Sequence, residues 1–79
     1  MLTGKRFEFK TSLAALETVA GERVAHIFPR GSRVLVISGP VGTDRMAEVL
    51  FESRTFTMFA VDLREFAIEI GERTSGADV

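Results

Sequence analysis

Apolar and polar residues alternate along much of this chain, within short segments separated by turn-forming residues. Apolar side chains recur at every second position in segments 6–9, 23–28 and 65–70, and all glycines and both prolines lie outside these segments. A period of two is typical of β-strands, and pieces of this length fit strands better than helices. The pattern therefore predicts a mostly β protein of short strands.

The segment Leu13–Val19 departs from this pattern. Its sequence, LAALETV, contains good helix formers, and Thr11 or Ser12 precedes it as a candidate N-cap. A short helix is slightly favoured here, and a bent strand remains the alternative.

The stretch from Val34 to Phe51 first suggests a phosphate-binding turn between a strand and a helix. A Walker A loop requires a lysine and a hydroxyl residue directly after its second glycine, because these groups contact the phosphates and the magnesium ion. Here Gly39 and Gly42 are only three positions apart, and no lysine follows them. The dinucleotide-binding glycine pattern is also absent. We therefore interpret the glycines as turn residues.

A hairpin explains this stretch better than a helix over residues 45–53, because one pairing scheme then satisfies three segments. With residues 39–44 as the loop, Ser38 faces Arg45, and a two-residue turn follows at 52–53 or 53–54. Val34 then lies opposite Val49, and Val36 opposite Ala47. The scheme gives the three strands one wholly apolar face: Val34, Val36, Ala47, Val49, Phe51, Phe56, Met58 and Ala60.

The opposite face of these three strands is also unusually apolar for a sheet with one solvated side. Only Glu48 and Thr57 interrupt it. We expect the N-terminal part of the chain or a second copy to cover it. A patch that covers its own copy favours a two-fold dimer, so we predict a homodimer whose contact includes Phe59, with a monomer that buries Phe59 internally as the alternative. The predicted interface consists of Leu35, Ile37, Met46, Leu50 and Phe59.

Composition limits the chemistry that the chain can perform. Its 79 residues contain no cysteine and a single histidine, so neither thiolate nor histidine clusters can hold a metal ion. No nucleophile or carboxylate is placed by the sequence beside His26, for which a hydrogen-bonded structural role is expected. We predict no enzyme activity and no cofactor.

Length, charge and hydropathy indicate one small domain over residues 1–74 and a disordered tail over residues 75–79. The formal net charge is −1, and no segment has the run of apolar residues that a membrane span or a signal peptide needs. The expected location is the cytoplasm, without membrane binding.

Eight arginines against two lysines are the one compositional bias. Arg30, Arg33, Arg45 and Arg54 fall at predicted strand ends and loops, where their planar guanidinium groups could bind phosphate. They are the candidate contacts of a nucleic-acid-binding alternative. The balanced net charge favours a solvated rim instead, so nucleic acid is kept only as the alternative partner.

The succession of five or six short strands resembles an SH3-like barrel. In that fold a short 3₁₀ turn precedes the last strand; here residues 60–63 would form the turn, and 66–70 the closing strand. Phe66, Ile68 and Ile70 would share its apolar face. The alternative is an α+β fold with helices over 45–54 and 61–71. The aromatic ligand groove of eukaryotic SH3 domains is not expected, because the chain has no Trp or Tyr.

The segment from Phe28 to Leu63 resembles a group of short uncharacterised bacterial proteins. The shared features are the Pro-x-Gly-Ser turn at 29–32, the Gly-Pro loop at 39–40 and the run TMFAVDL at 57–63. The resemblance implies a family and a small β-barrel but no activity. The leading functional hypothesis is a non-enzymatic protein-interaction module whose partner the sequence does not identify, and nucleic-acid binding is the alternative.

Overall fold

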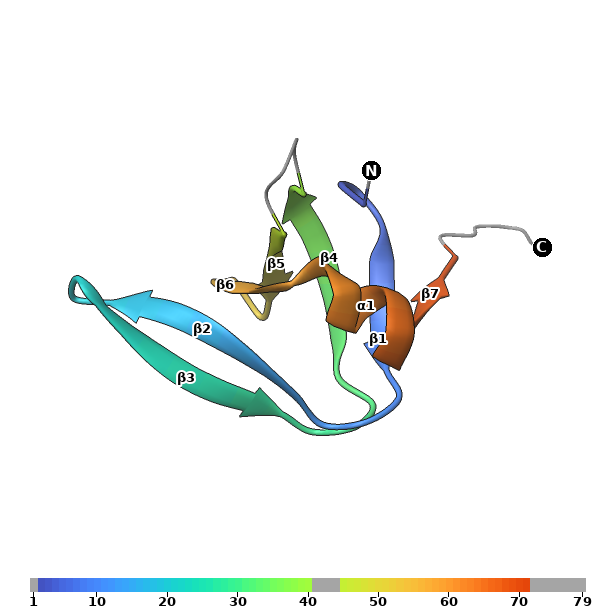
Figure 1. The fold of residues 1–79 in the computed structure, drawn as a ribbon, viewed down its shortest axis with the longest axis horizontal. Coiled ribbons are helices and arrows are strands. Elements are labelled where there is room, and N and C mark those ends of the chain that lie inside the picture. Colours follow the sequence, from blue (N-terminus) through green and yellow to red (C-terminus); the bar gives the residue numbers. More distant parts are fainter. Residues whose placement is uncertain (1, 41–44, 72–79) are drawn as a thin grey trace.

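The computed structural model describes residues 2–40 and 45–71, and these form a mostly β structure with one short helix (Figure 1). The predicted tail at 75–79 and most of the predicted loop at 39–44 lie outside the described residues. Seven strands are present rather than five or six. The elements are β1 (Arg6–Phe9), β2 (Leu13–Val19), β3 (Glu22–Phe28), β4 (Arg33–Ser38), β5 (Met46–Phe51), β6 (Arg54–Phe59), α1 (Ala60–Phe66) and β7 (Ala67–Ile70).

All seven strands belong to one antiparallel sheet with the order β3-β2-β6-β5-β4-β1-β7. The first strand therefore lies between β4 and the last strand. In the described part of the chain the edge strands β3 and β7 do not pair, so hydrogen bonds do not close the sheet into a barrel. Figure 1 shows the β2–β3 hairpin projecting away from the other strands, with α1 and β7 on the opposite side of the molecule.

The predicted hairpin of β4 and β5 is confirmed, and the alternative helix over residues 45–54 is wrong. The predicted register is also wrong: Val36 pairs with Val49, not with Ala47, and a bulge then places Ser38 opposite Glu48. The register changes just before Gly39, which turns directly over β5: an added Cβ there would lie 2.8 Å from the Met46 carbonyl oxygen. Before the bulge, each β4 residue pairs with a β5 residue two positions away from the predicted partner. Because a shift of two residues preserves the alternation, each side chain keeps its predicted face.

The second turn follows the first of its two predicted alternatives. Phe51 pairs with Arg54, and both intervening residues have positive φ, 50° at Glu52 and 69° at Ser53. A two-residue turn in which both residues have the left-handed backbone conformation matches the twist of the flanking strands. The predicted apolar face is confirmed as the core: all of its members are buried except Phe51, which is partly buried.

A helix at Leu13–Val19 is wrong, because this segment is β2 and pairs with β3 along its whole length. Leu13 and Ala15 are buried, whereas Ala14 between them is exposed. The pairing and the period-two burial outweigh the weak helix propensity of the segment. The prediction's alternative, a strand, is the observed structure.

The segment after β6 forms an α-helix, longer than the predicted 3₁₀ turn. It buries Ala60 and Leu63 against the core. The closing strand is present, but its predicted apolar face is wrong: Ala67 is buried, and Ile68 is 54% exposed. The helix still includes Phe66, and Ala67 then pairs with Phe9, which fixes Ala67 on the core side of the sheet.

Candidate binding surface on the outer face of the sheet

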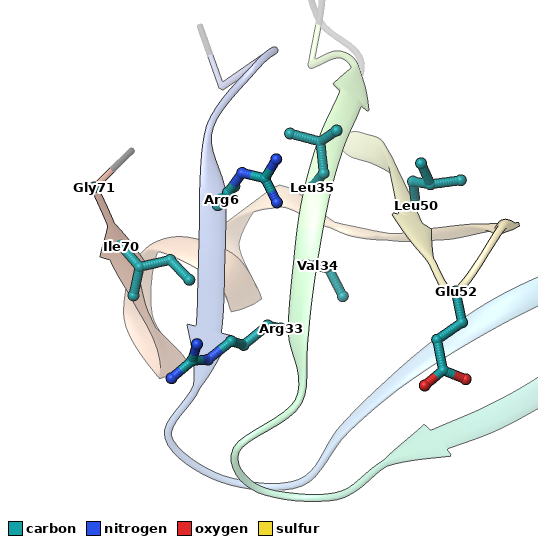
Figure 2. A pocket seen from close by; sticks show the side chains of 8 residues that line it. All are labelled: Arg6, Arg33, Val34, Leu35, Leu50, Glu52, Ile70 and Gly71. Atoms are coloured by element: carbon teal, nitrogen blue, oxygen red, sulfur yellow. The ribbon is translucent and has the colours of Figure 1, made fainter. Parts of the chain in front are cut away.

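The outer face of β4 and β5 carries an open pocket lined by both apolar and charged residues. Leu35 and Leu50 are cross-strand neighbours on this face, and both are partly buried. The pocket has a volume of about 440 Å³, and Figure 2 shows the side chains around it. It is lined by Arg6, Arg33, Val34, Leu35, Leu50, Glu52, Ile70 and Gly71. Its apolar side chains come from the three strands β4, β5 and β7, and β1, which pairs with both β4 and β7, lies between Leu35 and Ile70.

Charged groups of both signs surround this pocket. Arg33 lies opposite Glu8 on β1, and its Nε donates a hydrogen bond of 3.0 Å to Glu8 Oε1. Arg6 extends from β1 beside Leu35, and Glu52 lies at the other side, on the β5–β6 turn (Figure 2). An apolar floor with a charged rim can hold an apolar side chain while the rim contacts peptide groups. None of the lining residues has a hydroxyl, thiol or imidazole group.

The structure divides the predicted interface into two parts. Leu35 and Leu50 line the pocket, whereas Met46 and Phe59 form a second cross-strand pair on β5 and β6. Phe59 is 53% exposed, and Ile37, beside the β4 bulge, is 38% exposed. The alternative in which the chain itself buries Phe59 is therefore wrong for the described residues.

Sequence reasoning missed the contributions of Arg6 and Ile70 to this surface. Alternation with Phe7 and Phe9 puts Arg6 on the outer face, but only the pairing of β1 with β4 brings it to Leu35. The sequence pattern groups Ile70 with Phe66 and Ile68 on the apolar face of the closing strand. The true position of Ile70 depends on pairing with Arg6, a contact between opposite ends of the chain that no local pattern reports.

The candidate nucleic-acid residues do not form one basic surface. Arg33 is paired with Glu8, and Arg54 with Glu17. Arg45 precedes β5 at the end of the β5–β6 hairpin that is opposite to Arg54. Arg30 is exposed in the turn between β3 and β4.

Arg54 makes a two-pronged polar contact with Glu17. Its Nε donates a hydrogen bond of 2.7 Å to Glu17 Oε2, and a second guanidinium nitrogen bonds the other carboxylate oxygen. The same guanidinium group lies 5.4 Å from the Phe56 ring centroid. The hydrogen bond from Arg54 lowers the pKa of Glu17, and the carboxylate raises the pKa of Arg54.

His26 lies next to this ion pair on β3 and is partly buried. Its ring centroid is 4.6 Å from that of Phe28 and 5.2 Å from that of Phe56. The structure describes aromatic packing for this ring, and not the side-chain hydrogen bond that was expected. Among residues 2–40 and 45–71, no group of three His, Cys, Asp or Glu side chains is arranged to hold a metal ion.

Comparisons with known proteins add no identity: no family model, curated protein or solved structure matches the chain. The resemblance of residues 28–63 to a bacterial family stays a prediction. In the described ranges, no helix is long and apolar enough to cross a membrane.

Proposed function

We propose that this chain is a non-enzymatic protein-interaction module on a small SH3-like β-barrel. Two features support the fold assignment: consecutive hairpins β4–β5 and β5–β6, and a helical turn at α1 directly before a closing strand that pairs with β1. The functional assignment rests on the outer face of the sheet.

The pocket of Leu35, Leu50 and Ile70 is the observation that carries this proposal. A surface pocket in which a few apolar side chains lie beside charged groups of both signs is a candidate binding site. The rim contributed by Arg33 and Glu52 provides a donor and an acceptor for the backbone of an extended partner segment. The partner in this proposal is a segment of another protein that packs an apolar side chain against the two leucines.

Photo-crosslinking in the cells that make the protein tests this function. A benzophenone amino acid at position 50 is expected to capture a protein adduct, and the same group at position 19 is the matched control. Val19 is 48% exposed but lies on the β2–β3 hairpin, away from the pocket residues. Leu50→Thr should weaken binding of the captured protein by about tenfold or more, and Val19→Thr should leave it unchanged.

Two results would contradict the proposal. The first is the absence of any adduct at position 50, and the second is capture of the same proteins from both positions.

A further inference from the structure

The β3 strand has one side open along its whole length. It pairs with β2 through seven consecutive residues without a bulge, and no described residue pairs with its other side. An edge of this kind presents a row of backbone N–H and C=O groups to solvent. In Figure 1 the open side of β3 lies on the outside of the projecting hairpin.

Little within β3 protects this edge. Proteins blunt exposed edges with charged side chains, proline, bulges or very short strands, and of these features ERVAHIF has only Glu22 and Arg23, both at its start. The other edge strand, β7, has only four residues, and its Glu69 forms an ion pair with Lys5 at 3.5 Å. The long, regular edge of β3 is therefore the one that needs a covering strand.

Both faces of β3 also expose large apolar side chains. Val24 is 46% exposed on the core side of the hairpin, and Ile27 is 62% exposed on the outer side. A strand added beside β3 would cover both side chains and would satisfy the open backbone groups.

We propose that β3 pairs with β3 of a second copy, antiparallel, with Ala25 at the two-fold axis. This register pairs all seven residues of each strand. It places Arg23 opposite Ile27 and Val24 opposite His26, so each exposed apolar side chain gains a long or aromatic neighbour. No like charges face each other, and the small Ala25 allows close approach at the axis.

Other self-pairing registers fit less well. An axis at Arg23 would oppose two arginines, and an axis at Val24 or at His26 would leave part of β3 unpaired. With the axis at Ala25 the two seven-stranded sheets join into one continuous sheet. The contact uses none of the residues that line the outer pocket, so it is independent of the proposed function.

Sedimentation equilibrium at micromolar concentration tests the dimer. The wild-type chain should be dimeric, and Ile27→Lys should weaken dimerisation by about tenfold or more, because it adds a charge to the paired edge. The matched control is Phe59→Lys, at a similarly exposed position on β6, which should leave the dimer intact. Unchanged circular dichroism verifies that both variants are folded.

A monomeric wild-type chain would overturn the proposal. So would a dimer that Phe59→Lys dissociates and Ile27→Lys does not, a result that would support the predicted contact through Phe59 instead.

A chemical cross-link tests the register, since the chain has no native cysteine. Ala25→Cys should give a covalent dimer with a short bismaleimide, because the two positions meet at the axis. Ile68→Cys, exposed on the opposite edge strand, is the matched control and should stay monomeric. Equal cross-linking of both variants, or none at position 25, would exclude this register.

Discussion

The Glu17–Arg54 ion pair joins two strands that share little backbone pairing. The described register of β2 with β6 is a single residue pair, Leu16 with Thr57. The two-pronged contact of Arg54 with Glu17 adds a second connection at the same junction. Bidentate arginine–carboxylate geometry is the kind of ion pair that contributes measurably at a protein surface.

The contribution of this ion pair should depend on pH. The folded state lowers the pKa of Glu17, so its stabilisation is present above the pKa of the unfolded chain and is lost as the pH falls through the folded-state pKa. We expect Glu17→Gln to lower the free energy of unfolding at neutral pH and to have a vanishing effect in acid. Urea denaturation at successive pH values measures this difference.

Glu48→Gln is the control for this experiment, at an exposed carboxyl for which the structure describes no ion pair. A loss of stability in Glu17→Gln that persists unchanged into acid would show that the carboxylate charge is not responsible.

The β5–β6 turn shows how far local sequence determined an element of this fold. Its position was predicted from the apolar faces of the two strands, and the structure confirms it at Glu52 and Ser53. The sequence there lacks the Asn-Gly or Asp-Gly pair that usually marks such a turn. The apolar pattern limited the turn to residues 52–53 or 53–54, since both positions keep the core face of β6, and the observed pairing of Phe51 with Arg54 selects the first.

Ser53→Gly should stabilise the protein by about 1 kcal/mol, since glycine adopts the left-handed conformation without the steric cost that serine bears. Ser38→Gly is the matched control: that residue ends β4 without a positive φ, and glycine there should cost about 0.5–1 kcal/mol. Thermal unfolding of both variants tests this prediction, and a midpoint for Ser53→Gly below that of the wild-type chain would contradict it.

Where prediction failed, long-range pairing had overruled a local preference. The segment Leu13–Val19 has helix-forming residues, but pairing with β3 makes it a strand. Ile70 alternates with polar residues in the sequence, as a buried residue would. However, α1 ends at Phe66 and Ala67 becomes the buried residue of β7, so Ile70 lies on the outer face of the sheet. The pocket combines Ile70 with Arg6 and Leu35, so it could not be predicted from sequence, whereas the outward positions of Leu35 and Leu50 were.

Phe28 connects the projecting hairpin to the rest of the molecule. Its ring is fully buried and packs edge-on against Phe9, Phe51 and Phe56, with centroid distances of 5.7, 4.9 and 4.8 Å. These partners belong to β1, β5 and β6. One aromatic side chain at the base of the hairpin therefore packs against three other strands of the sheet.

Phe28→Ala should lower the free energy of unfolding by about 3–5 kcal/mol, because it leaves a cavity among three rings. Phe59→Ala, a matched change at an exposed ring, should shift stability by about 0.5 kcal/mol or less. Urea denaturation compares the two, and similar midpoints would contradict the central role of Phe28.

The position of β1 between β4 and β7 has a consequence for the order of assembly during folding. Its first partner, β4, follows it in the chain after two further strands. Its second partner, β7, is separated from it by nearly the whole described chain. Contacts this distant in sequence slow folding, because a long loop must close before they form. The β2–β3 and β5–β6 hairpins join strands that are neighbours in sequence and can form first, but the sheet is complete only after β7 has paired with β1.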